Sequence, residues 1–194
     1  MKATQRQIHC PSETQRDILS RQGYVCIYCA EPFGSVVKRA KLSVTVVHYD
    51  HAVPFAYLNS NPRWNWVAAC NICNLIKGDK MFHSIQEIRM HVLAVRERRR
   101  HVLAWVPPVS SEQDPERWAV AFASFLAELS FRDARQIEKD LPSPLGAALS
   151  AVERTRAANG IRKPTRRDVD LGGIIAYGSN NRGAWPWSVT AGGK

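Results

Sequence analysis

The sequence predicts an α+β fold in which a small unit of two strands and a helix precedes a mainly helical region. The stretch L-S-V-T-V-V-H at residues 42–48 is rich in β-branched side chains, which favours a buried strand. W-N-W-V-A-A-C at residues 64–70 predicts a second strand, and the N-I-C-N-L-I-K-G-D-K stretch after it predicts a short helix that ends near Gly78. Beyond residue 84, apolar residues recur at helical spacing.

The first unit, which we place at residues 1–83, is predicted to open with a short helix. Ser12, followed three residues later by Gln15, forms a capping box, and Gly23 supplies a C-terminal stop. Pro54 is expected to end regular structure after the first strand. Residues 55–64, which contain the turn signal N-S-N-P, are expected to form a loop.

The helical region is placed at residues 84–160, and a basic, Gly/Asn-rich irregular tail at 161–194. Ser84 opens a helix that should run to about residue 103, and Asp114 caps a second. A third helix is expected over 145–158. Apolar stripes mark the first two helices: Ile85, Ile88, Val92 and Val95, then Trp118, Phe122, Phe125 and Leu129. The second stripe fits a core or a dimer seam, and R-E-R-R-R-H at 96–101 fits either a DNA contact or a solvated helix end.

The composition indicates an intracellular protein with an anionic partner. The formal net charge is +10, and residues 1–83 hold ten Lys/Arg against five Asp/Glu. Residues 84–194 therefore carry the other half of the positive charge, so both parts of the chain are basic. Such a surplus favours nucleic acid or acidic lipid, with solubility alone as the alternative. The first twenty residues are polar, and no apolar run approaches the roughly 18 residues of a membrane helix. We therefore expect a cytoplasmic protein without a membrane span.

Two C-x-x-C pairs, Cys26/Cys29 and Cys70/Cys73, predict a structural zinc ion. Each pair places two thiolates on one side of the ion, and two pairs complete a tetrahedron. In a reducing cytosol such pairs are metal ligands more often than disulfides. The 40 residues between Cys29 and Cys70 must contain structure of their own, so zinc would clamp the ends of a ββα unit. Cys10 has no partner and is interpreted as a free thiol.

The polar residues at the end of the first predicted strand suggest hydrolytic chemistry. The Asp50 carboxylate can hold a hard divalent cation, and the neighbouring His51 imidazole can accept a proton from water. Adjacent strand residues point to opposite faces, so the strand must end or bend for both to face one site. Asn74, on the predicted short helix, could bring an amide oxygen to the same metal, with Lys77 and Lys80 on roughly the same helical face.

These motifs, C-I-Y-C, Y-D-H-A-V-P and W-N-W-V-A-A-C-N-I-C-N-L-I-K-G-D-K, resemble those of the HNH endonucleases of the four-cysteine type, within the wider ββα-metal nucleases. The match covers about residues 16–82. The resemblance implies that His51 is the general base, that Asp50 and Asn74 hold one catalytic Mg²⁺ or Mn²⁺ ion, and that Asn65 braces the loop bearing the base. One departure is Y-L-N-S-N-P-R-W before Asn65, where the family often has Gly-Gly.

The expected activity is therefore hydrolysis of phosphodiester bonds in DNA, with Lys77, Lys80 and Arg63 near phosphates. Two alternatives stay open. One is a zinc-stabilised nucleic-acid-binding module without cleavage activity, and the other is a nuclease that acts on RNA or within a phage or defence assembly. His48 and His83 are minor candidates for ligand and DNA contact. The helical region could support a homodimer or a larger assembly.

Overall fold

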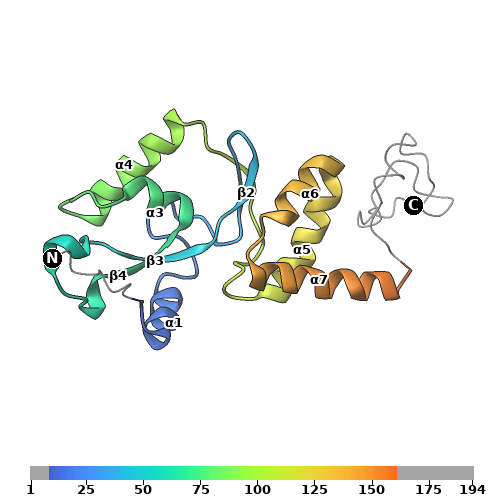
Figure 1. The fold of residues 1–194 in the computed structure, drawn as a ribbon, viewed down its shortest axis with the longest axis horizontal. Coiled ribbons are helices and arrows are strands. Elements are labelled where there is room, and N and C mark those ends of the chain that lie inside the picture. Colours follow the sequence, from blue (N-terminus) through green and yellow to red (C-terminus); the bar gives the residue numbers. More distant parts are fainter. Residues whose placement is uncertain (1–8, 161–194) are drawn as a thin grey trace, which may run out of the picture. The chain divides into compact units, whose positions relative to one another are not determined.

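The computed structural model describes residues 9–160, and the chain forms two compact units (Figure 1). Of the described residues, unit 1 comprises 9–33 together with Val46–Arg99, and unit 2 comprises Gly34–Thr45 together with 100–160. Small antiparallel sheets in the first half precede a mainly helical second half, so the predicted α+β class is confirmed. The tail predicted at 161–194 lies outside the described residues.

Unit 1 contains a two-stranded sheet, two longer helices and three short helical segments. Strands β3 and β4 are antiparallel, and their register runs from the Val47–Cys70 pair to the His51–Trp66 pair without a bulge. The elements in chain order are α1 (Ser12–Arg21), β3 (Val47–His51), α2 (Phe55–Leu58), η1 (Arg63–Asn65), β4 (Trp66–Cys70), α3 (Asn71–Lys77) and α4 (Ile85–Arg98).

The core of unit 1 joins α1 and α4 to the sheet and to the cysteines. The predicted apolar stripe of α4 supplies Ile88, Val92 and Val95 to this core, so α4 packs within the compact unit that extends to Arg99. Ser84 caps α4 as expected, because its hydroxyl accepts the Glu87 N–H at 3.2 Å, whereas the Glu87 carboxylate accepts the N–H of the preceding residue, His83, at 2.8 Å.

The β-branched stretch at 42–48 forms two strands instead of one. Strand β2 (Leu42–Val44) pairs with β1 (Val36–Lys38), whereas β3 pairs with β4. The change of partner occurs between Thr45 and Val46: the Thr45 N–H bonds to the Ser35 carbonyl, and Val46 exchanges bonds with Asn71. The prediction of strand structure for this stretch is correct, but strand propensity does not specify which neighbour each half of the stretch pairs with.

The described residues of unit 2 form a three-stranded sheet and the helices α5 (Pro115–Glu128), α6 (Phe131–Lys139) and α7 (Ser143–Ala158). Strand β1 lies between β2 and β5 (Val102–Trp105) and is antiparallel to both. Trp118 and Phe122 are completely buried with their rings stacked 4.6 Å apart, so these two residues of the predicted apolar stripe lie in the core of the unit.

Three boundaries differ from the sequence prediction. Helix α4 ends at Arg98, because Arg100 adopts a left-handed φ of 53° and the residues after it pair with β1 as strand β5. Helix α6 lies in a segment for which no helix was predicted, and a short α2 occupies part of the expected loop. At the end of α4, non-local strand pairing prevails over the local helical pattern.

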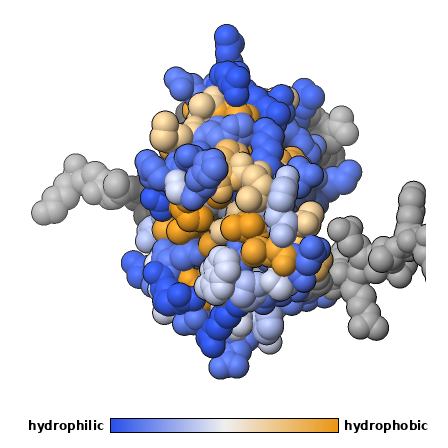
Figure 2. Space-filling view, turned by 90° about the vertical axis from the view of Figure 1, so that its left-hand side faces the viewer, coloured by the Kyte–Doolittle hydropathy of each residue, from blue (hydrophilic) through white to orange (hydrophobic). Residues whose placement is uncertain are grey.

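One face of the molecule, shown in Figure 2, carries apolar residues in a band between hydrophilic ones. Unit 1 exposes several large apolar side chains, including Leu75 on α3 and Met90 on α4. The outer side of α3 is therefore open to solvent, which matters for the site below. Among residues 9–160, no helix combines the length and the hydropathy that crossing a bilayer would require.

Candidate functional site

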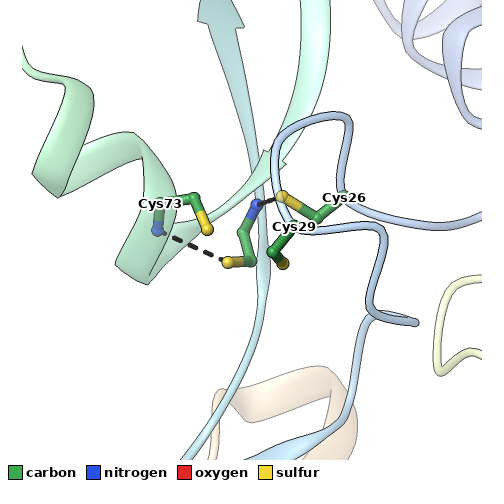
Figure 3. Close-up of side chains that lie close together, drawn as sticks. Cys26, Cys29 and Cys73 are labelled. Atoms are coloured by element: carbon green, nitrogen blue, oxygen red, sulfur yellow. Dashed lines mark hydrogen bonds between the residues drawn. The ribbon is translucent and has the colours of Figure 1, made fainter. Parts of the chain in front are cut away.

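The four cysteines of the two C-x-x-C pairs come together in unit 1 (Figure 3). Their sulfur atoms all lie within 4.8 Å of one another. Two backbone donors point at sulfur: the Cys70 N–H bonds to Cys26 Sγ at 3.2 Å, and the Cys73 N–H bonds to Cys70 Sγ at 3.4 Å. Cys26, Cys70 and Cys73 are buried. The sequence pairs were thus predicted correctly as one cluster.

The cluster fits a zinc ion in geometry and charge. Sulfur atoms about 2.3 Å from a tetrahedral ion are about 3.8 Å apart, which agrees with this compactness. Hydrogen bonds from the neighbouring thiols, Cys29 first, lower the pKa of Cys26. The pKa values of Cys29 and Cys73 are raised, chiefly by Cys26. One thiolate is therefore favoured, whereas deprotonation of the other thiols requires a cation to offset their charge. Cys26, Cys29, Cys70 and Cys73 are the residues that would hold this cation.

A buried arginine lies against the cluster. Arg96 of α4 is only 5% exposed, its Nη2 lies 2.8 Å from Glu31 Oε1, and its Nη1 donates to Cys73 Sγ at 3.9 Å. Glu31 in turn accepts from the Cys29 thiol at 3.5 Å. The guanidinium thus places one positive charge beside the four sulfurs and joins α4 to the first cysteine pair. This role replaces the DNA contact considered for Arg96.

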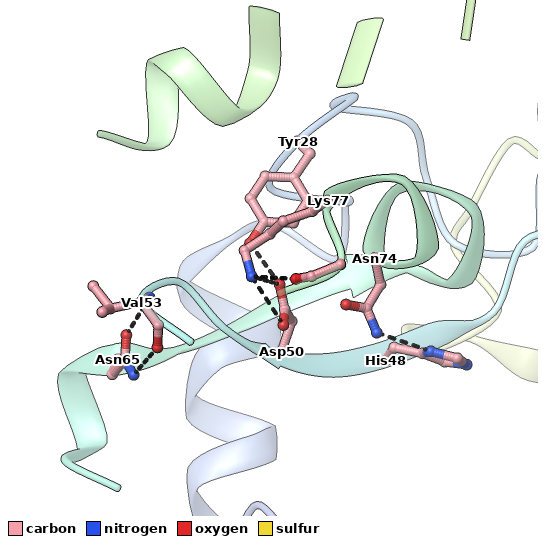
Figure 4. A network of polar contacts seen from close by, with 8 residues as sticks. Tyr28, His48, Asp50, Val53, Asn65, Asn74 and Lys77 are labelled. Carbon is pink, nitrogen blue, oxygen red and sulfur yellow. Dashed lines mark hydrogen bonds and ion pairs between the residues drawn. The ribbon is translucent and has the colours of Figure 1, made fainter. Parts of the chain in front are cut away.

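Asp50 makes an ion pair within unit 1 (Figure 4). Lys77 Nζ lies 3.1 Å from Asp50 Oδ2, and the Tyr28 hydroxyl donates to the same oxygen at 2.8 Å. Lys77 is 1% exposed, so it is not at the surface where we expected it to meet a phosphate. Burial and the Asp50 carboxylate raise the pKa of Tyr28, which keeps its proton on the hydroxyl and available to Asp50.

His51 points to the other face of β3 from Asp50. The strand continues in register through His51, so the bend that would turn both side chains to one face is not present. His51 Nε2 lies 2.7 Å from Asn61 Oδ1, and its ring lies 3.8 Å from that of Trp66. With the Asn61 oxygen as acceptor, the proton sits on Nε2, and Nδ1 is left as the basic nitrogen.

Asn74 lies on α3 beside the β3 face that carries Asp50. Its Nδ2 is 3.2 Å from His48 Nδ1, and Figure 4 shows the amide oxygen on the side toward Asp50 and Lys77. The structure therefore brings Asp50 and Asn74 to one face and adds His48 to it. His48 precedes Asp50 by two residues, which is the spacing that places side chains on one side of a strand.

Asn65 ties down the loop that follows His51. Its side chain is fully buried, its Oδ1 accepts the Val53 N–H and its Nδ2 donates to the Val53 carbonyl, both at 2.8 Å. The Asn65 carbonyl also accepts the Ala52 N–H at 2.9 Å. The two residues next to His51 in the loop are thereby fixed to the start of β4.

The other predicted cations are at the surface. Lys80 Nζ lies 3.2 Å from His91 Nε2, and desolvation together with the Lys80 charge lowers the pKa of His91. Arg63 is exposed and forms a 3.2 Å ion pair with Asp17. His83 is exposed, and its N–H bonds to Glu87. All three remain accessible to a polyanion.

Sequence reasoning missed three residues whose partners become evident only in the fold. Tyr28 lies inside the first C-x-x-C pair and yet reaches Asp50, so that pair is joined to the candidate site. Asn61 lies in the N-S-N-P turn, and its position ten residues after His51 was the only available signal. Glu31, two residues after Cys29, carries a charge whose partner Arg96 is 65 residues away.

The oxygen donors at this site fit a hard divalent cation in kind. A carboxylate and an amide oxygen are suitable ligands for Mg²⁺ or Mn²⁺, and they would come from Asp50 and Asn74. The fit has one condition. The Lys77 ammonium neutralises the Asp50 carboxylate, so a divalent cation would have to weaken or displace this ion pair. Lys77 Nζ is farther from Oδ1, at 3.4 Å, and that oxygen is the one better placed to accept a second partner.

We compared the chain with protein-family models, with curated proteins and with solved structures, and none of the three comparisons gave a match.

Proposed function

We propose that the chain is a metal-dependent DNA endonuclease with a separate structural zinc ion. The observation that carries the proposal is that Asn74 of α3 lies beside the face of β3 that carries Asp50. His51 follows Asp50 in the strand, and its Nε2 is held by Asn61. The motif resemblance to the HNH endonucleases agrees with this grouping. The net charge of +10 favours a polyanionic substrate.

The open edge of β3 is the place where a phosphodiester would meet both faces of the strand. Strand β3 pairs with β4 on one side only, so its other edge has no strand partner in the described sheet. Side chains of adjacent residues flank such an edge from opposite faces. A phosphate at the edge would have Asp50 on one side and His51 on the other, so the reaction does not require both side chains to share a face.

In the proposed reaction, His51 Nδ1 accepts a proton from water, and the water oxygen forms a bond to phosphorus. The bond from phosphorus to the 3′-oxygen breaks, and that oxygen takes up a proton, which leaves a 5′-phosphate and a 3′-hydroxyl. Asn61 keeps the imidazole in the tautomer that accepts the proton. A divalent cation held by Asp50 and Asn74 would supply stabilisation of the negative charge that develops at the phosphate.

A second candidate is a zinc-stabilised nucleic-acid-binding module without cleavage. The buried Lys77–Asp50 ion pair favours it, because an ammonium group already occupies the carboxylate that would bind the metal. The two candidates differ in one respect, which is whether Mg²⁺ or Mn²⁺ elicits hydrolysis.

The experiment that separates them uses the zinc-loaded protein with supercoiled plasmid, single-stranded DNA and RNA. Each substrate is incubated with Mg²⁺, with Mn²⁺ and without added divalent cation. The proposal expects nicked or linear plasmid only when Mg²⁺ or Mn²⁺ is present. Cleavage of RNA alone would contradict the DNA assignment, and binding without cleavage under all conditions would support the module.

A further inference from the structure

The turn between β1 and β2 carries a dense group of cations in unit 2. Three residues, Arg39, Ala40 and Lys41, join the strands, and the Arg39 N–H closes the turn on the Lys41 carbonyl at 3.2 Å. Lys38 is the last residue of β1. All four residues from Lys38 to Lys41 are exposed, so three positive charges lie within four consecutive residues of one tight turn.

The cationic turn borders a pocket of about 580 Å³ that also includes the start of α6. Lys38 and Lys41 line it from the hairpin, and Arg132 lines it from the first turn of α6. The carboxylate in its lining, Asp133, accepts a hydrogen bond from the Ser130 hydroxyl at 2.9 Å. Three positive charges thus face one lining carboxylate, and we call this surface the hairpin–α6 surface.

Nearby acidic groups neutralise only part of this charge. Lys41 Nζ pairs with Asp140 at 2.7 Å, and this contact lowers the pKa of Asp140. Lys38, Arg39 and Arg132 have no ion-pair partner among the residues that the structure describes. Three cations without a described ion-pair partner therefore face solvent at this place, against the one lining carboxylate of Asp133.

We propose that the hairpin–α6 surface binds the sugar-phosphate backbone of double-stranded DNA. A row of unpaired Lys and Arg side chains is complementary in charge to a polyphosphate and releases counterions when it binds one. A β-ribbon is narrow enough for the major groove, so a cationic turn can reach the phosphates on its borders. Ala40, the one uncharged side chain of the turn, offers no hydrogen bond to a base, so we assign the role of this surface to its charged residues and their contacts with phosphates.

This inference rests on the proposed function for the choice of DNA as partner, but it concerns a different unit and a different property. The test is binding of a short duplex to the zinc-loaded protein without Mg²⁺ or Mn²⁺, measured over a range of about 50 to 200 mM salt. The test variant is Lys38→Gln/Arg39→Gln, which keeps Lys41 because that residue also pairs with Asp140. The control is Arg117→Gln/Arg154→Gln, two exposed arginines of unit 2 outside this surface.

The hairpin variant should weaken binding by about tenfold or more at low salt and lower the slope of log affinity against log salt by about one for each residue changed. The control, with the same loss of net charge, should change the slope by much less. An unchanged slope in the hairpin variant, an equal loss in both variants, or no binding by the unaltered chain would each overturn the inference. Unaltered melting temperatures would show that both variants are folded.

Binding and cleavage fail separately in this design. A chain that binds through the hairpin but never cuts with Mg²⁺ or Mn²⁺ contradicts the proposed function and leaves the inference standing. A chain that cuts plasmid and keeps its salt slope in the hairpin variant contradicts the inference alone.

Discussion

Replacing Arg96 with Gln is predicted to weaken zinc retention and to destabilise unit 1. The side chains of Arg96 and Glu31 are 6% and 19% exposed, and the closest N···O distance between them is 2.8 Å. Breaking such a buried pair from one side costs about 3 kcal/mol, because the other charge is left unpaired. Here the remaining charge is the Glu31 carboxylate, which lies 3.5 Å from Cys29 Sγ. Two effects therefore add: a lost positive charge near Cys73 and an uncompensated negative charge near Cys29.

The assay measures the transfer of zinc from the protein to a competing chelator through the absorbance of the zinc–chelator complex. Loss of an outer-sphere partner typically lowers metal affinity about 10- to 100-fold, and we expect Arg96→Gln to lie in this range. Arg98→Gln is the matched control, because Arg98 lies on the same helix and is exposed. Adding Glu31→Gln to Arg96→Gln should restore part of the affinity by removing the unpaired carboxylate. Equal zinc retention in Arg96→Gln and Arg98→Gln would refute the reasoning.

Three further outcomes follow from the polar contacts of unit 1. Lys77→Met should lower the free energy of unfolding by about 3 kcal/mol by leaving Asp50 unpaired, and Mg²⁺ should restore part of it; a melting temperature that Mg²⁺ does not change would contradict this. In the unaltered protein, stability should fall as pH rises above about 10, because the pKa of Tyr28 is raised in the folded state by burial and by Asp50. Tyr28→Phe should lack this contribution, so an equally steep loss on alkaline denaturation of the variant would be evidence against it. Asn65→Ala should cost about 2 kcal/mol in chemical denaturation because both polar groups of Val53 lose a partner, whereas an unchanged midpoint would contradict that account.

The four-cysteine cluster and the main helices could be predicted from the sequence because their signals are local. Each C-x-x-C pair forms its own local turn with two ligands. A four-ligand site therefore needs two such turns, whatever the length of chain between them. Helix α4 follows from an N-cap serine and a stripe at helical spacing, and both occur in the structure. Helix α5 likewise begins after Asp114, which accepts the Arg117 N–H at 2.9 Å.

The remaining features depend on contacts between residues far apart in the chain. Residues 42–48 have strand propensity throughout, but nothing local indicates that the chain changes partner between Thr45 and Val46. The residues after Arg100 form a strand because β1 is there to pair with them. Lys77 was expected at the surface from its place on α3, but it is buried against the Asp50 carboxylate, which also accepts the Tyr28 hydroxyl. A charged residue is buried when the fold supplies its counter-charge, and the sequence pattern does not indicate which distant residue will be that partner.

Tyr28 links the stability of the zinc cluster to the candidate site. It lies between Cys26 and Cys29, and its hydroxyl holds Asp50 at 2.8 Å. An ion that holds the first C-x-x-C pair in place would therefore also hold Tyr28, and through it the orientation of the Asp50 carboxylate. The four-cysteine cluster and the candidate site are then parts of one arrangement within unit 1.

The central claim, that His51 is the base of a metal-dependent DNA endonuclease, is tested most directly by His51→Ala in plasmid cleavage with Mg²⁺ or Mn²⁺. The account predicts a loss of about 10²- to 10⁴-fold in cleavage rate, the usual contribution of a general base, with zinc content and duplex binding unchanged. His9→Ala, which removes an exposed histidine remote in sequence, should cut at the unaltered rate. If His51→Ala cleaves plasmid as fast as His9→Ala, His51 is not the base and the proposed mechanism is contradicted.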